Sequence, residues 1–256
     1  GNCERLESLF VQAAQQKPDL VLATEGALEG YVVMDVVEGR RSAQEMWEIA
    51  EPIDGPAIQR FQKLAAQLKT CLAFGFAERS GEEVYNAAIF IDRTGDICGL
   101  YHKSQLAEGT HPDWTFNRIG KQLRAFDTPL GRMGFVICND RWNPLLVRAV
   151  VADGARLLLI PAYGERGKRQ NRAVLARGRE NGVPIVEANV GMNLIVNRGE
   201  IAASPWGHNR ITPAQVELPW PVAPETARRL ESEYLAGQEG EMARRYQKTM
   251  ERIGRD

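Results

Sequence analysis

The stretch that decides the fold is residues 131–140, GRMGFVICND, in which an apolar run ends at the thiol of Cys138. Uninterrupted apolar runs are typical of strands that are covered on both faces. Two further runs end in a reactive side chain: residues 20–25, LVLATE, end at Glu25, and residues 97–103, ICGLYHK, end at Lys103. Ligands of α/β sheets bind beyond the carboxyl ends of the strands. The sequence therefore predicts a base, a cation and a nucleophile at strand ends.

Strands and helices alternate outward from these runs, with a hairpin turn at residues 92–96. This order favours mixed sheets with helices outside, in the α/β class. No linker or repeat divides residues 1–256, so we expect a single domain. The predicted helices cover residues 3–16, 56–68, 144–153 and 169–181, with two more in 224–253 that break at Gly237. The predicted strands cover residues 20–23, 70–77, 84–91, 97–102, 123–127, 133–138, 156–161, 183–188 and 193–196.

The composition is that of an ordinary globular protein: 256 residues, 44% hydrophobic, 25% charged and a net charge of −1. The longest uncharged run, Ala188–Asn197, is about half of the ~20 residues that a membrane helix needs. The near-neutral charge argues against nucleic acid as a partner. The four cysteines include no CxxC pair, which argues against a zinc cluster and favours a reducing, cytoplasmic location.

Each of the three reactive residues also has a plain structural interpretation. Cys138 could be a small buried hydrophobic residue, Glu25 could stabilise a helix start, and Lys103 could be a solvated loop charge. Periodicity alone does not choose between these interpretations and catalysis.

The surroundings of the three residues resemble the nitrilase superfamily of carbon–nitrogen hydrolases. Residues 19–31, 100–106 and 131–140 are similar to the blocks that carry the family's glutamate, lysine and cysteine. Further similar segments are residues 75–78, 85–88, 126–129, Arg177 with 180–181, 188–189 and 195–200. Together they extend from the first helix to about residue 203.

The resemblance implies a four-layer αββα sandwich that pairs into a homodimer or larger homo-oligomer. It also implies thiol-based acyl transfer without a metal or organic cofactor. Glu25 is then the general base, Cys138 the nucleophile, and Lys103 with the backbone N–H of Asn139 stabilises the oxyanion. Family members often have a second glutamate that positions the substrate. Glu108 is the candidate here and Asp113 the alternative, although Glu108 could equally be a solvated carboxylate.

Residues 139–144, NDRWNP, indicate which carbon–nitrogen bond is cleaved. They are similar to the amide and N-carbamoyl branches, whereas nitrilases have Trp-Glu after the cysteine. In the N-carbamoyl-D-amino-acid enzymes, arginines near the cysteine hold a substrate carboxylate, as Arg141 could. Alternatively, Arg141 forms an internal ion pair with Asp140 or Glu180. Trp142 and Leu145 depart from the carbamoylase pattern.

Three functions follow from these residues. The first is hydrolysis of a small amide or N-carbamoyl compound, and the second is hydrolysis of a nitrile. The third is a catalytically silent binding protein with the same fold. The family's first strand has no counterpart here, so a fragment that lacks it is one expectation. Residues from about 204 to 256 match the family poorly and are expected to take part in oligomer contacts.

Overall fold

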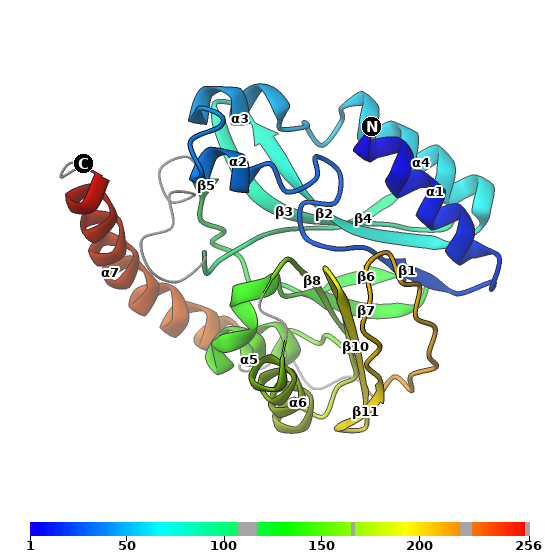
Figure 1. Cartoon of the computed structure of the whole chain (residues 1–256). Helices are drawn as coiled ribbons and strands as arrows, with labels where there is room; N and C mark the ends of the chain where they lie inside the picture. Colours follow the sequence, from blue (N-terminus) through cyan, green and yellow to red (C-terminus); the bar gives the residue numbers. More distant parts are fainter. Residues whose placement is uncertain (107–116, 165–166, 221–226, 254–256) are drawn as a thin grey trace.

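Two mixed β-sheets form the centre of the computed structural model, which describes residues 1–106, 117–164, 167–220 and 227–253 (Figure 1). One sheet has the strand order β1-β2-β3-β4, with β5 paired to β3, and the other has the order β11-β10-β9-β8-β7-β6. The strands of the first sheet are β1 Leu20–Leu22, β2 Cys71–Ser80, β3 Glu83–Ile91, β4 Ile97–His102 and β5 Asn117–Arg118. Those of the second are β6 Phe126–Thr128, β7 Gly131–Phe135, β8 Leu158–Ala162, β9 Ile185–Asn189, β10 Met192–Asn197 and β11 Glu200–Ala203.

Helices cover the outer face of each sheet. On the first sheet, Phe10 of α1 and Phe61 of α4 pack on Phe74 of β2, with ring centroids 6.0 and 4.9 Å apart. On the second sheet, α5 contacts β7 and α6 contacts β10. The helices are α1 Asn2–Ala14, α2 Val33–Val37, α3 Ala43–Ile49, α4 Pro56–Leu68, α5 Pro144–Ala152, α6 Lys168–Asn181 and α7 Ala227–Ile253.

The two sheets pack face to face, because apolar side chains alternate along the strands. In β2, Cys71 and Ala73 belong to the cluster shared with β7 and β8, whereas Leu72 and Phe74 belong to the cluster with α1 and α4. Across the sheet interface, Phe90 of β3 contacts Phe126 of β6 at 5.6 Å between centroids. A strand covered on both faces needs no polar residues, which accounts for its continuous apolar sequence. The predicted four-layer α/β sandwich is confirmed.

The tail prediction is wrong at Gly237, because α7 runs unbroken from Ala227 to Ile253. A glycine inside a helix costs about 1 kcal/mol relative to alanine, which packing can offset. Tyr234, Gln238 and Met242, four residues apart, are buried on one side of α7. Glu231 also accepts a hydrogen bond from the backbone N–H of Leu123 at 2.8 Å. These contacts hold the helix together across the glycine.

Other differences concern short elements. The strand predicted at 123–127 is only Phe126–Thr128, since the backbone N–H groups of Leu123 and Ala125 bond to Glu231 and Asp153 instead. Helices α2 and α3, strands β5 and β11 and a 3₁₀ helix at Cys138–Trp142 were not predicted. Apart from α3, none of these exceeds five residues, and a short element gives little periodicity to detect.

Candidate active site

Glu25 and Lys103 form a buried ion pair beyond the ends of β1 and β4. Lys103 Nζ lies 2.7 Å from Glu25 Oε1, and Asn86 of β3 donates to the same oxygen at 2.8 Å. Among the described residues, the other oxygen, Oε2, is buried without a hydrogen-bond partner. An ionised carboxylate oxygen in this state can still accept a proton or a hydrogen bond. Because both side chains are buried, Lys103 is not the solvated loop charge that was the alternative, and Glu25 lies in a turn instead of a helix start.

Cys138 begins the 3₁₀ helix Cys138–Trp142, three residues after β7 ends, in a strained backbone conformation. Its φ of +44° lies in the left-handed region that residues other than glycine rarely adopt. Such a conformation costs roughly 1–3 kcal/mol and is concentrated at functional sites. The residue is half-buried, and its Sγ lies 3.9 Å from the carbonyl oxygen of Tyr163. This backbone distinguishes Cys138 from an ordinary apolar core residue.

The charges around Cys138 favour a protonated thiol at rest. Burial raises the pKa of the thiol, and so does the Glu25 carboxylate, whereas Lys103 and Arg141 act in the opposite direction. For Lys103, burial lowers the pKa, but Glu25 and Cys138 outweigh it and hold the pKa above its ordinary value. The site therefore holds an ammonium group that stays charged and a thiol that needs a base.

Asp140 ties the cysteine turn to the segment after Lys103. Its carboxylate accepts hydrogen bonds from the Tyr101 hydroxyl at 2.8 Å, the Gln105 backbone N–H at 2.6 Å and the Ile137 backbone N–H at 3.0 Å. Burial raises its pKa to about 6 despite these bonds. Since Tyr101 and Gln105 flank Lys103, Asp140 sets the position of the thiol relative to the ammonium group.

Asn139 and Arg141, the predicted substrate contacts, lie on the same 3₁₀ helix as Cys138. The Asn139 side chain donates to the Leu106 carbonyl at 2.7 Å, so its amide supports the backbone. Arg141 Nη1 lies 3.5 Å from Glu187 Oε1, and both side chains are buried. The internal ion pair is therefore present, but neither expected partner is correct. Asp140 bonds to the three groups above, and Glu180 pairs with Arg177 at 3.1 Å.

Glu187 is a site residue that the sequence analysis missed. It lies in β9, and Gln170 of α6 donates a hydrogen bond to its carboxylate. Burial raises its pKa to about 7, with Arg141 acting against the shift. A lone acid inside the apolar run of residues 185–188 was the available signal, because carboxylates are rarely fully buried unless paired.

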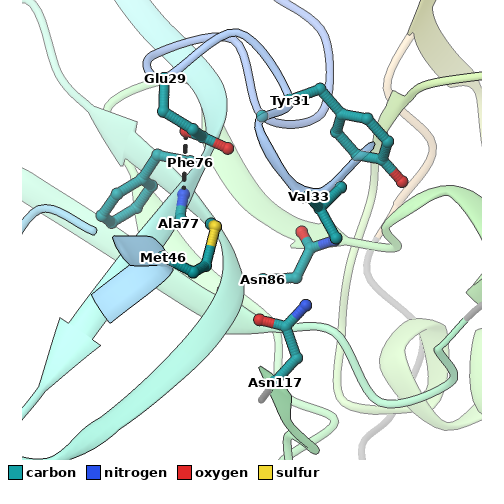
Figure 2. A pocket seen from close by; sticks show the side chains of 9 residues that line it. Glu29, Tyr31, Val33, Met46, Phe76, Ala77, Asn86 and Asn117 are labelled. Atoms are coloured by element: carbon teal, nitrogen blue, oxygen red, sulfur yellow. Dashed lines mark hydrogen bonds between the residues drawn. The ribbon is translucent and has the colours of Figure 1, made fainter. Parts of the chain in front are cut away.

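A recess beside Glu25 adds further polar groups (Figure 2). Asn86, which holds Glu25, lines it together with Glu29, Tyr31 and Asn117. Glu29 accepts a hydrogen bond from the Ala77 backbone N–H at 3.0 Å, and burial raises its pKa to about 7. Figure 2 draws Glu29 and Asn117 at opposite ends of the recess. The motif around residue 86 and the family-like block of residues 19–31 marked this region, but no role was predicted for Glu29.

An aromatic pair joins the loop after β1 in the first sheet to the loop after β8 in the second sheet. Tyr31 stacks on Tyr163 with ring centroids 3.9 Å apart. The loop of Tyr163 is held by Asn189, whose amide bonds to both the N–H and the carbonyl of Gly164, at 3.1 and 2.9 Å. The Cys138 thiol in turn lies 3.9 Å from the carbonyl oxygen of Tyr163. The pair therefore connects the Glu25 side of the site to the Cys138 side.

Glu108 and its alternative Asp113 lie outside the described residues. Within the described ranges, no three His, Cys, Asp or Glu side chains gather as metal ligands would. The same part of the chain has no helix with the length and apolar character to cross a bilayer. All four cysteines are free thiols.

The fold and this cluster define a class: a four-layer α/β protein with a thiol, a carboxylate and an ammonium group where its two sheets meet. Comparison with known proteins gives the family. The carbon–nitrogen hydrolase family model matches residues 1–218. The chain therefore belongs to the carbon–nitrogen hydrolases, the nitrilase superfamily.

The chain is similar to several known proteins. It is 30% identical over 202 residues to the N-carbamoylputrescine amidase of Oryza sativa subsp. japonica, covering 76% of this chain and 62% of the relative. It is 29% identical over 163 residues to the citrullinase of Francisella tularensis subsp. tularensis, covering 62% of this chain and 55% of the relative. The chain thus spans less than two thirds of each.

A solved structure shares the fold. A double mutant of the amidase from Nesterenkonia sp. AN1, in complex with acrylamide, superposes with a TM-score of 0.67. The two chains are 22% identical, and the match covers 80% of each. This likeness supports the sandwich architecture and is too distant in sequence to transfer residue roles.

Proposed function

We propose that this chain hydrolyses a carbon–nitrogen bond in a small amide or N-carbamoyl compound, with Cys138 as nucleophile, Glu25 as general base and Lys103 as oxyanion stabiliser. The observation that carries the proposal is the buried Glu25–Lys103 pair, 2.7 Å apart, whose charges act on the Cys138 thiol. Membership of the carbon–nitrogen hydrolases supports the reaction class. The strained backbone at Cys138 supports its role as the reacting residue.

The first half of the reaction forms a thioester. Glu25 takes the Sγ proton of Cys138, and Sγ attacks the carbonyl carbon while the π electrons move to oxygen. Lys103 Nζ and the backbone N–H of Asn139 stabilise that oxyanion. The tetrahedral intermediate then collapses, the C–N bond breaks, and Glu25 returns the proton to the leaving nitrogen, which departs as ammonia or an amine.

Water completes the cycle. Glu25 accepts a proton from water, whose oxygen attacks the thioester carbon, and the C–S bond breaks. The proton returns to Sγ, and the acid is released. An N-carbamoyl substrate loses ammonia in the first half and yields a carbamic acid, which decomposes to an amine and carbon dioxide. Glu108 is proposed, from the family resemblance alone, as the carboxylate that positions the substrate.

The substrate class follows from the relatives and from the residues after Cys138. One relative is named for N-carbamoylputrescine and another for citrulline. We therefore propose N-carbamoyl compounds and amides as the substrate classes to test first. Asn139 and Arg141 are proposed as substrate contacts. In support, Arg141 has two buried nitrogens, Nε and Nη1, without hydrogen-bond partners in the described part of the chain.

Ammonia release from amides, N-carbamoyl compounds and nitriles tests this proposal. We expect release from the first two classes, lost in Cys138→Ala and kept in Cys98→Ala. Cys98 is a matched control because it is a half-buried thiol whose pKa burial raises to about 11. Release that persists in Cys138→Ala would contradict the mechanism. Ammonia release from nitriles alone would show that the substrate is a nitrile and not an amide or N-carbamoyl compound. No release at all would favour a catalytically silent binding protein.

We also propose that residues 1–256 form one domain and that the chain associates with itself through residues from about 204 onward. Exposed apolar side chains support this, since Trp206 is 56% and Trp220 90% exposed. A single monomeric species in sedimentation velocity would contradict self-association.

A further inference from the structure

Arg141 lies beside the Cys138 thiol. The two residues are three apart in the segment Cys138–Trp142, and the charges of their side chains act on each other. Arg141 is 1% exposed, so it cannot turn toward solvent. Although burial opposes its charge, the pKa of Arg141 lies above its ordinary value because Cys138 and Glu187 stand beside it.

Glu187 supplies the counter-charge for Arg141. Glu187 Oε1 lies 3.5 Å from Arg141 Nη1, and the side chain of Glu187 is fully buried. Its neighbours across the sheet are Ile160 of β8 and Leu194 of β10, which are apolar. The remaining contact is the neutral amide of Gln170 from α6. Arg141 is therefore the charge, within the described residues, that compensates the Glu187 carboxylate.

The other charged side chains near Cys138 can also be matched with their counter-charges. Lys103 is paired with Glu25, and Asp140 adds a further buried carboxyl group. Arg169 of α6 is a further cation near this helix: it is exposed and lies over the Trp142 ring at 4.9 Å, where solvent screens its charge. Lys103 and Arg141, the buried cations near Cys138 in the described ranges, therefore each have a carboxylate as counter-charge. While Glu187 is ionised, a substrate carboxylate would find no uncompensated buried positive charge beside Cys138.

We infer that Glu187 is a specificity-determining residue: it neutralises Arg141, so that the site accepts an uncharged group beside Cys138 and disfavours a carboxylate. Arg141 then offers its unpartnered N–H groups to a neutral oxygen of the substrate. This inference rests on the proposed role of Cys138 and narrows the substrate class. It differs from the carboxylate clamp that the family resemblance suggested for Arg141.

Two reagents that differ only in charge test the inference at Cys138 itself. Iodoacetamide is neutral and iodoacetate is an anion, and both alkylate the same sulfur with loss of iodide. The measured quantity is the rate of Cys138 alkylation by iodoacetate divided by its rate of alkylation by iodoacetamide. Peptide mass mapping monitors each reaction at Cys138. The thiol's own ionisation cancels in this ratio. We expect Glu187→Gln to raise the ratio about tenfold, since it leaves the Arg141 charge uncompensated.

Matched variants separate this effect from a structural one. Glu180→Gln, which removes an exposed carboxylate of α6, should leave the ratio unchanged. Arg141→Gln combined with Glu187→Gln should return the ratio to the wild-type value. An unchanged ratio in folded Glu187→Gln, or a rise that survives in the double variant, would overturn the inference while leaving the proposed hydrolysis standing. Cys138 that is not alkylated selectively would count against the proposed function itself.

The wild-type protein provides a second measurement in case Glu187→Gln does not fold. The pKa of Glu187 is raised to about 7, so this carboxyl takes up a proton as pH falls from 8 to 6 and releases the charge of Arg141. The alkylation ratio should therefore rise over that range. Asp140 and Glu29 also titrate near it, with pKa values raised to about 6 and 7. A ratio that is flat with pH would contradict the inference, as would a folded Glu187→Gln variant that keeps the full dependence.

Discussion

The reactivity of Cys138 depends on which neighbour holds the proton. Burial and the Glu25 carboxylate raise the thiol pKa, and Lys103 and Arg141 lower it. A thiol placed this way is a weak nucleophile until a base takes its proton. Glu25 has one oxygen bonded to Lys103 and Asn86 and a second one without a partner in the described part of the chain. The second oxygen is the one that we assign to proton transfer.

Glu25→Gln should separate hydrolysis from thiol ionisation. Losing the base is expected to lower kcat by about 10²–10⁴-fold. Losing the negative charge removes a cause that raises the Cys138 pKa, so the pKa falls and alkylation by iodoacetamide begins at lower pH. The pH profile of alkylation and the rate of ammonia release measure the two effects. Glu25 is not the base if hydrolysis stays at the wild-type rate.

Three of the site residues could be located from the sequence, because each ends an apolar strand and belongs to a family block. For Glu187, a lone acid in an apolar run, and for Glu29, inside the block of residues 19–31, the sequence indicates a position but no role, because their roles depend on contacts with distant residues. The carboxylate of Glu187 meets Arg141 only after β9 and the 3₁₀ helix pack together. The same reason explains why Asp140 and Glu180 were wrong as partners of Arg141. For Arg141, the nearest opposite charge comes from a residue far away in the sequence.

At the scale of elements, strand ends place the reacting groups. Glu25 follows β1 and Lys103 follows β4 in the first sheet, whereas Cys138 follows β7 in the second. The long apolar elements could be predicted, since α4 and β3 have regular periodicity. Helix α3 has a recognisable start, in which the Ser42 hydroxyl accepts from the Glu45 N–H at 3.2 Å, and this Ser-x-x-Glu signal was overlooked. The tail prediction failed because the cost of a single glycine, Gly237, is too small to end a helix whose neighbouring residues are buried.

Gly75 of β2 allows the Glu25 turn to approach the sheet. A Cβ at this position would lie 2.6 Å from Glu25 Cα and 2.8 Å from Gly26 N, and these backbone atoms cannot easily move. Gly75→Ala should therefore displace Glu25. Because a misplacement of about 1 Å costs on the order of 10²-fold in rate, kcat should fall by that factor.

Gly237→Ala is the matched control for Gly75→Ala. A Cβ at Gly237 meets no atom within 4 Å, and alanine favours the helix by about 1 kcal/mol. Activity should stay at the wild-type level, and the midpoint of thermal unfolding should rise slightly. Full activity in a folded Gly75→Ala variant would contradict the claim that the strand positions Glu25.

At the scale of the whole molecule, the site exists only where the two sheets meet. The four layers, seen in Figure 1, bury a shared core between the sheets. Tyr31 and Tyr163 stack across the loops beside the thiol. The fold class could be predicted from alternating strands and helices together with the family blocks. The relative placement of the sheets could not, because it depends on contacts such as Phe90 with Phe126.

The central claim is that Cys138 carries the acyl group during turnover. The most direct measurement mixes the chain with a substrate that it hydrolyses, quenches the reaction in acid within milliseconds, and weighs the intact protein and its peptides. The account predicts a mass increase equal to the acyl group on the peptide that contains Cys138, and no such increase in Cys138→Ala. An acyl adduct on another residue, or turnover by Cys138→Ala at the wild-type rate, would contradict it.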